Sequence, residues 1–324
     1  MIEPQQRRHM VPLNIQRECE RLARNFRLGV LGAFVVGWGF NSGFCSPGTN
    51  ALLADQPAVF DIQSPELTES SGLAASNRVA GYFWTHNDSG GEPKLFAIDE
   101  TGTLTGSVVL DGAKAIDWED IASFTDGASK RLVIADIGDN QAIRNEVTLY
   151  LMDEPDPLQD GQTALYREIR VRYPDGPRDC EAIGVDLRHR QILMVGKSFL
   201  PLAPVYSMPL PSQLFSAETM VQPVVLERVG TIAAPLITAM EVDPRCGDLF
   251  LVNYFQCFRF KVDKDDAPGA WIKKVPSLME LPKLKQIEAV AIDANGDVWV
   301  TSEGSPGKLA RVEMSDEKVP QVAK

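Results

Sequence analysis

The stretch Trp118-Glu-Asp-Ile-Ala122 opens a short apolar run, and the next apolar run ends in Asp136-Ile-Gly-Asp-Asn140. Related openings occur four more times, at Glu69-Ser-Ser-Gly-Leu-Ala74, Cys180-Glu-Ala-Ile-Gly184, Thr238-Ala-Met-Glu-Val-Asp243 and Ile287-Glu-Ala-Val-Ala291. Each opening is followed by a turn and by a second apolar run with a polar end. A repeat of about fifty residues that is built from strands is typical of a β-propeller.

Each repeat predicts one blade of four antiparallel strands joined by tight turns. In the first repeat we expect strands at 72–76, 82–86, 95–99 and 104–110, and in the fourth at 239–242, 248–253, 256–262 and 271–275. The fold class is therefore all-β, a single propeller over residues 57–315 with five blades. Six blades are the alternative, because 62 and 57 residues separate Glu119, Glu181 and Thr238.

The fifth repeat shows only three strands of its own. An apolar stretch at 58–63 precedes the first repeat and has no partner there. Pairing this stretch with the C-terminal strands would complete the last blade and remove an exposed sheet edge. We therefore expect an N-terminal strand to close the ring, with residues 316–324 left as a C-terminal tail.

The first 54 residues differ from the rest of the chain. Six arginines precede a 13-residue apolar run at 28–40, and small and polar residues follow as far as Ala54. This pattern predicts a secretory signal peptide cleaved near Ala54, and hence a secreted or periplasmic protein. An uncleaved N-terminal anchor, and with it a membrane contact, is the alternative, although a span needs about 20 apolar residues.

The formal net charge is -12 and the pI is about 4.8. Binding to nucleic acid phosphates needs a basic surface, so nucleic acid is excluded as an expected partner. We expect a monomer that binds a small molecule, a saccharide or a peptide.

Polar residues both precede the first strand and follow the second strand of every repeat. Antiparallel pairing brings these two positions together, so all five pairs should meet at one mouth of the central channel. The carboxylates expected at this mouth are Glu69, Asp88, Asp117, Glu119, Asp136, Asp139, Asp179, Glu181, Glu288 and Glu303. So many carboxylates repel one another unless some are protonated or a cation neutralises them.

A set of carboxylate oxygens suits Ca²⁺, and another divalent cation is the alternative. The predicted ligands are Glu69, Glu119, Asp136, Asp139, Glu181 and Glu288, with neutral oxygens from Asn87, Asn140 and Asn253. A purely structural reading stays open, in which each carboxylate caps backbone amides of a neighbouring blade.

Five further residues are candidates for catalysis or binding. His86 and Asp88 are the candidate general bases. Lys197, Asn253 and Trp118 are the candidate substrate-binding residues. For His86 the alternative is a hydrogen-bonded structural role, and for Trp118 it is packing in a blade core.

The strand openings and Phe83-Trp-Thr-His-Asn-Asp-Ser-Gly-Gly91 resemble those of secreted bacterial propellers related to esterase-like phytase. The stretch 66–305 carries this resemblance, and Asp117–Asn140 is its most similar part. The chain also loosely resembles gluconolactonase-type propellers, which have Glu, Asn and Asp side chains around a divalent metal. Glu69, Asn140 and Asn253 are the residues that loosely correspond to this set. The resemblance is to six-bladed, calcium-associated propeller families, and it leaves the activity open.

Two functions are therefore expected. The first is a ligand-binding module of the cell envelope with an acidic, cation-binding channel mouth. The alternative is a metal-dependent hydrolase of an ester, lactone or phosphate ester.

Overall fold

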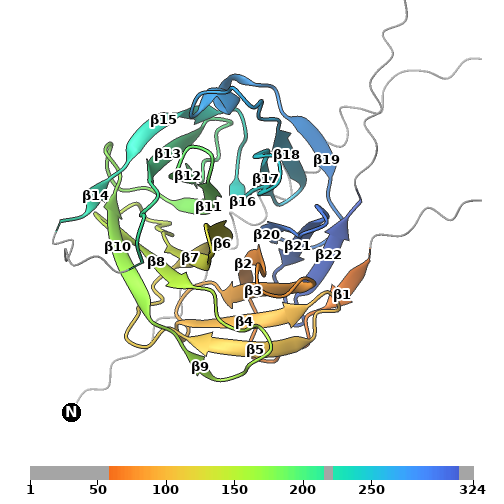
Figure 1. Ribbon diagram of the computed structural model, residues 1–324. Coiled ribbons are helices and arrows are strands. Elements are labelled where there is room, and N and C mark those ends of the chain that lie inside the picture. Colours follow the sequence, from red (N-terminus) through yellow and green to blue (C-terminus); the bar gives the residue numbers. More distant parts are fainter. Residues whose placement is uncertain (1–57, 215–221, 314–324) are drawn as a thin grey trace, which may run out of the picture. The chain divides into compact units, whose positions relative to one another are not determined.

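The computed structural model describes residues 58–214 and 222–313, which form five β-sheets arranged around a common centre (Figure 1). The innermost strands contact one another in cyclic order. They are β2 (Ser70–Ala75), β6 (Trp118–Asp126), β11 (Cys180–Asp186), β16 (Ile237–Val242) and β20 (Ile287–Ile292), and β20 contacts β2 again. The five-bladed propeller predicted from the sequence is confirmed, and the six-bladed alternative is wrong. The expected leader and tail lie outside the described residues.

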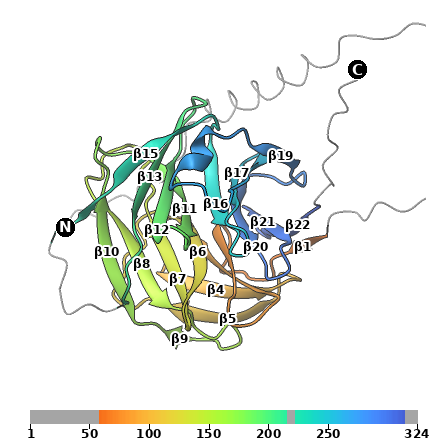
Figure 2. The same cartoon turned by 45° about the horizontal axis from the view of Figure 1, so that its top comes forward.

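Each blade runs outward from its innermost strand, as the tilted view makes clear (Figure 2). Blade 1 continues with β3 (Tyr82–Asn87), β4 (Lys94–Asp99) and β5 (Leu104–Val109). Blade 2 continues with β7 (Ser129–Asp136), β8 (Val147–Asp153) and β10 (Tyr166–Arg172), and blade 3 with β12 (Gln191–Gly196), β13 (Ala203–Pro209) and β15 (Glu227–Ile232). Blade 4 continues with β17 (Leu249–Asn253), β18 (Gln256–Phe260) and β19 (Ser277–Glu280), and blade 5 with β21 (Val298–Ser302) and β22 (Lys308–Val312).

The N-terminal strand β1 (Val59–Asp61) completes blade 5, as the sequence predicts. It pairs antiparallel with β22, with Val59 opposite Ala310 and Asp61 opposite Lys308. The Lys308 ammonium also forms an ion pair with the Asp61 carboxylate. The two ends of the ring are thus joined within one sheet, in which β1 covers the edge of β22 and becomes the outer strand of blade 5.

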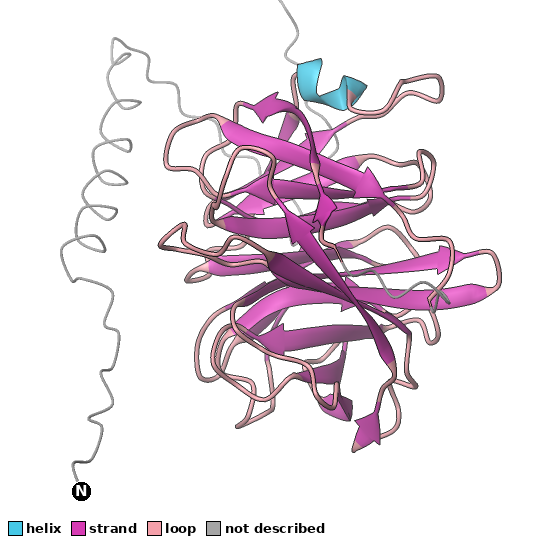
Figure 3. Ribbon diagram, turned by 90° about the vertical axis from the view of Figure 1, so that its left-hand side faces the viewer, coloured by secondary structure: helices cyan, strands magenta, loops and turns pink. Residues whose placement is uncertain are grey.

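The fourth strand of blade 4 is not where the sequence placed it. The stretch expected to form a strand at 271–275 contains a 3₁₀ helix, η1 (Ala270–Lys273), and the strand follows as β19 (Figure 3). Gly269 enters the helix with a positive φ of 72°. The ring of Trp271 is buried against Phe260, with centroids 5.1 Å apart, so the apolar residues of this stretch anchor a turn. Within the described residues, no helix is long and apolar enough to cross a membrane.

The extra length of the second and third repeats lies at the outer edges of two blades. After β8 the chain forms β9 (Gln162–Thr163), which pairs parallel with β5 of blade 1. After β13 it forms β14 (Val224–Val225), which pairs parallel with β10 of blade 2. Both additions reach back to the preceding blade and cover its edge, so the surplus residues make no sixth blade.

The hydrophobic core is divided among the spaces between neighbouring blades. The described residues form five clusters of buried side chains, and each cluster draws its members from two adjacent sheets. Trp84 and Leu95 of blade 1, for example, pack with Ile121 and Ile134 of blade 2. Burial of apolar surface is the main force that drives folding. Because every blade contributes to two clusters, none can bury its faces without both neighbours.

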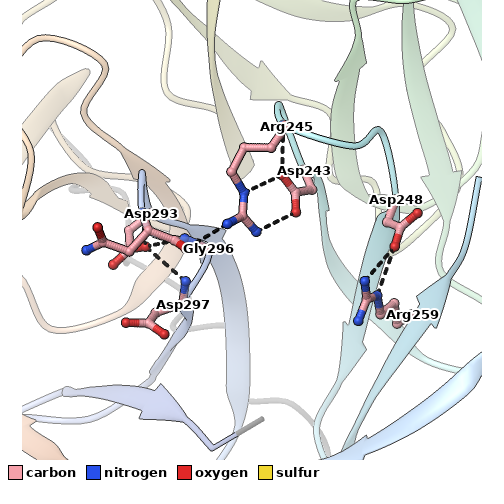
Figure 4. A network of polar contacts seen from close by, with 8 residues as sticks. Asp243, Arg245, Asp248, Arg259, Asp293, Gly296 and Asp297 are labelled. Atoms are coloured by element: carbon pink, nitrogen blue, oxygen red, sulfur yellow. Dashed lines mark hydrogen bonds and ion pairs between the residues drawn. The ribbon is translucent and has the colours of Figure 1, made fainter. Parts of the chain in front are cut away.

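Arginines link the turns of neighbouring blades between their first and second strands (Figure 4). Arg245 pairs with Asp243 in its own turn and donates to the Asn295 carbonyl of blade 5 at 2.6 Å. A Cβ on Gly296 would lie 1.9 Å from the Arg245 guanidinium, and Gly296 has a φ of 93°, so glycine is required there. Arg188 of blade 3 similarly donates to the Cys246 carbonyl of blade 4.

Asp120 joins three blades near the axis. Its side chain is fully buried and accepts backbone N–H groups from Ile121 at 2.9 Å, Ile183 at 2.9 Å and Met240 at 3.2 Å. Burial raises the pKa of this carboxyl, and the three amide donors oppose that effect. The N–H groups of Ile183 and Met240 donate to one carboxylate oxygen, and that of Ile121 donates to the other. Only a side chain with two acceptor oxygens therefore satisfies all three donors.

Replacement of Asp120 by Asn should therefore destabilise the ring. The amide NH₂ of Asn must face at least one backbone N–H, which leaves a buried donor without an acceptor and costs about 1–3 kcal/mol. We expect a lower urea midpoint for Asp120→Asn and a nearly unchanged one for Asp153→Asn, whose side chain is 68% exposed and whose ion pair with Arg131, at 3.7 Å, contributes little at such exposure. Equal midpoints in both variants would show that Asp120 does not join the blades.

Candidate functional site: an acidic channel mouth

A β-bulge interrupts the first hairpin of every blade at the same place. The register shifts by one residue in each innermost strand, and the extra residues are Ser71, Glu119, Glu181, Thr238 and Glu288. A bulge leaves one residue unpaired, bends the strand and re-aims side chains, and it is common beside functional sites. The repeated motif of the sequence is thus a repeated backbone feature.

The bulge residues of neighbouring blades lie close to one another. The Ser71 hydroxyl donates to the Glu119 carbonyl at 3.1 Å, and the Thr238 hydroxyl donates to the Ile287 carbonyl at 3.1 Å. The side chains of Glu119, Glu181 and Glu288 are buried. At the bulge position, blades 2, 3 and 5 therefore carry a buried carboxylate, and blades 1 and 4 carry a hydroxyl.

Glu69 does not occupy the bulge position, although its stretch is related in sequence to those of Glu119, Glu181 and Glu288. Ser71 is the bulge residue of blade 1, and Glu69 lies two residues before it. The Glu69 carbonyl accepts the Asp88 N–H at 3.0 Å, just as the Asp117 carbonyl accepts Gly138 N–H and the Asp179 carbonyl accepts Lys197 N–H. By this criterion Glu69 is equivalent to Asp117 and Asp179, which lie at the mouth but were absent from the predicted ligand set.

Two groups of carboxylates meet at the mouth. One oxygen each of Asp88, Asp117 and Glu119 lie within 4.8 Å of one another, and so do oxygens of Glu119, Asp179 and Glu181. A cation with oxygen ligands at about 2.3–2.6 Å fits between atoms at this spacing. A Cβ on Gly138 would lie 2.1 Å from the Glu119 carboxylate and 2.4 Å from that of Asp117, so glycine leaves the room for this approach.

The polar side chains at the ends of the second strands do not join these two groups but accept hydrogen bonds from backbone N–H groups. Asn87 accepts the N–H groups of Thr68 and Glu69. Asp136 accepts the N–H of Asp117 at 3.1 Å and pairs with the Arg144 guanidinium at 2.9 Å. These side chains hold the segment that leads into the innermost strand.

Asn253 and Asp139 are engaged in the same way. Asn253 accepts the N–H groups of Phe255 and Gln256. The Asp139 carboxylate accepts two N–H groups from its own loop, and its backbone N–H donates to the Asp179 carboxylate at 2.9 Å. Asn140 is exposed. The structure therefore separates Asp136, Asp139 and the three asparagines from the two carboxylate groups.

Burial and mutual repulsion raise the pKa values at the mouth. Burial, followed by the charges of Asp117 and Glu69, raises the pKa of Asp88 to about 7. Burial raises the pKa of Glu181 to about 8, although the charge of Lys197 opposes it. The pKa values of Glu119 and Glu288 are raised well above their usual range, chiefly by burial and next by Glu181.

Lys197 supplies a positive charge inside this acidic region. Its ammonium forms an ion pair with Oε1 of Glu181 and lies 5.4 Å from the centre of the Tyr254 ring. Within the described residues, the buried Oε2 of Glu181 and Oδ1 of Asp88 have no hydrogen-bond partner. Buried polar atoms normally have one, so these two oxygens point to a missing partner such as a cation.

His86 and Trp118 are placed in the blade core rather than on the mouth surface. His86 is fully buried, contacts the Asn87 carbonyl at 3.0 Å and packs edge-on against Trp118 at 5.5 Å. Burial lowers the pKa of His86 to about 4, so the ring is neutral at neutral pH. Trp118 is 1% exposed, and its indole N–H donates to the Lys114 carbonyl. Both placements agree with the structural alternatives.

Comparison with known proteins gives similarity of fold only. No protein-family model and no curated protein match the chain. Among solved structures, it is similar to the PQQ-bound aldose sugar dehydrogenase of Streptomyces coelicolor (11% identity, 80% of this chain and 98% of that chain, TM-score 0.42). It is also similar to the apo aldose sugar dehydrogenase of Escherichia coli (12% identity, 80% and 99%, TM-score 0.45) and to a gluconolactonase of Xanthomonas campestris (12% identity, 83% and 96%, TM-score 0.43). Similarity at this level does not assign an activity to this chain.

The raised pKa values predict how stability depends on pH in the absence of divalent cations. Folded Asp88 and Glu181 bind protons up to pH values near 7 and 8, whereas unfolded carboxyls release theirs near about pH 4. This contribution to stability is complete below the unfolded pKa and is lost as pH rises through the folded values. In chelator, the urea midpoint should therefore fall between about pH 5 and pH 8.

Replacement of Asp88 by Asn should weaken this dependence and raise the midpoint at pH 8, because it removes one charge from a crowded site. Asp153→Asn is the matched control at an exposed position. An equally steep loss of stability in Asp88→Asn and in the unsubstituted protein would contradict the assignment.

Proposed function

We propose that the chain is a propeller that binds a divalent cation at the channel mouth and uses it to hold a small-molecule ligand. The observation that carries this proposal is the group formed by Glu119, Asp179 and Glu181, in which a buried Glu181 oxygen has no partner among the described residues. A buried charge without a partner is costly, and a cation bound to the Glu181 carboxylate would offset that cost.

Ca²⁺ fits this group best. Carboxylate oxygens are hard ligands, and the group contains no sulfur or imidazole ligand. Ca²⁺ takes six to eight oxygens, so three carboxylates leave positions for water or for oxygens of a ligand. A ligand with a carboxylate, phosphate or sugar hydroxyl group would meet this requirement.

An exposed aromatic side chain lies near Lys197. Phe255 is 63% exposed, its ring is 6.0 Å from that of Tyr254, and the Lys197 ammonium lies 5.4 Å from the centre of the Tyr254 ring. This side chain favours a ligand with an apolar part.

The expected leader would place this site outside the cytoplasm, in the periplasm or in the medium. Extracellular calcium modules bind with dissociation constants of about 10⁻⁴–10⁻³ M. Together with the resemblance to calcium-associated propellers, this supports a ligand-binding module of the cell envelope.

Calcium should stabilise the folded protein. A ligand present at 100 times its dissociation constant adds about 2.7 kcal/mol to the free energy of unfolding. We expect thermal unfolding to shift upward on addition of Ca²⁺, the shift to be lost in Glu181→Gln, and the shift to persist in Asp153→Asn. A Glu181→Gln variant that responds to Ca²⁺ like the unsubstituted protein would exclude this site.

One observation favours a metal-dependent hydrolase as the second candidate. Asp88 lies next to the proposed ligand Glu119 and has an unpartnered buried oxygen. A general base must lie within reach of the water that it deprotonates, and a bound cation lowers the pKa of its water. Asp88 would then accept the proton of a water that attacks an ester, lactone or phosphate ester.

Purified protein assayed on chromogenic carboxylic and phosphate esters separates the two functions. The hydrolase predicts turnover that chelator abolishes and that Asp88→Asn lowers by about 10²–10⁴-fold. Calcium binding without turnover of any of these substrates would support the binding module instead.

A further inference from the structure

We propose that the mouth holds two divalent cations, with Glu119 as the carboxylate that bridges them. This inference rests on the proposed cation site and adds a second position, formed by Asp88, Asp117 and Glu119. Both positions include Glu119, and in each the three ligand oxygens lie within 4.8 Å of one another. Paired metal sites joined through shared ligands have their cations about 3.5–4 Å apart.

Each of the two cation positions includes a buried carboxylate oxygen without a hydrogen-bond partner in the described part of the chain. Oε2 of Glu181 belongs to the first position and Oδ1 of Asp88 to the second, and neither has a hydrogen-bond partner among the described residues. Glu119 is 6% exposed, and its carboxylate belongs to both groups. A buried carboxylate shared by two acidic groups has the setting of a bridging ligand.

Separate supports hold the two positions. Asp136 accepts the Asp117 N–H and so fixes the backbone of the second position. The Asp139 N–H donates to Asp179 and so orients a ligand of the first. Gly138 lies between these two supports and leaves space for the carboxylates of Asp117 and Glu119. Ligands that are fixed before the cation arrives lose less entropy on binding.

The charges also favour two cations. The five carboxylates of the two groups and the Lys197 ammonium leave four negative charges, which one divalent cation does not balance, and the buried Glu288 adds a fifth. Lys197 contacts Oε1 of Glu181 and leaves Oε2 available. With a cation bound to Asp88, that residue serves as a ligand and not as a base.

Metal stoichiometry tests the inference. We expect calorimetric titration of chelator-treated protein with Ca²⁺ to give two cations per chain, falling to one in both Asp117→Asn and Asp179→Asn. The Asp153→Asn control should keep two. A value of one per unsubstituted chain would overturn the second position and leave the proposed function standing, whereas a value of zero would overturn both.

A second measurement avoids the folding of variants. The unsubstituted protein loaded with Mn²⁺ should give an electron paramagnetic resonance spectrum of two exchange-coupled ions, because a carboxylate bridge couples neighbouring Mn²⁺. Signals of isolated Mn²⁺ alone, at saturating metal, would overturn the bridge.

Discussion

The bulge in each innermost strand is the constraint on which the mouth depends. An uninterrupted ladder alternates its side chains strictly between two faces, and a shift of one residue would exchange those faces. The bulge adds one residue without disturbing the pairing that follows, so the strands keep their apolar faces toward the neighbouring blades. Its extra residue reaches the channel mouth, where Glu119, Glu181 and Glu288 lie. A structural repeat thereby offers five equivalent places for chemistry.

The blades use these places unequally. Blades 2 and 3 carry acids both at the bulge and two residues before it, whereas blades 1 and 4 carry Ser71 and Thr238, whose hydroxyls bind backbone carbonyls of the next blade. The two close-packed acidic groups therefore draw on blades 1 to 3 and do not form a symmetric ring. Propellers have a symmetry that comes from folding, and departures from it mark the residues that folding does not need.

The repeated features of the fold could be predicted from the sequence. The hairpins, the number of blades and the closing strand β1 follow from apolar runs at regular spacing, because every blade must bury both of its faces. The fourth strand of blade 4 was misplaced, since Trp271 is as apolar as a strand residue but packs from a 3₁₀ turn. Local composition cannot separate these two uses of an apolar residue.

The candidate site could be read only in part, because residue type does not reveal what a carboxylate binds. Asp136 and Asp139 have the same chemistry as Asp117 and Asp179, yet the first two accept backbone N–H groups and the other two reach the acidic groups. Glu69 was aligned with the bulge glutamates, although Ser71 occupies that place. Only the backbone N–H groups around each side chain decide between these roles.

Lys197 makes so acidic a mouth compatible with a folded chain. Its ion pair with Glu181 and its position over the Tyr254 ring place one positive charge where burial has removed water. One ammonium cannot balance every neighbouring carboxylate, and burial, together with repulsion from these carboxylates, raises the pKa of Asp88 to about 7 and that of Glu181 to about 8. A cation that enters must displace those protons, so proton release and cation binding are linked. Near neutral pH, the carboxylates at the mouth are thus neutralised either by protons or by a bound cation.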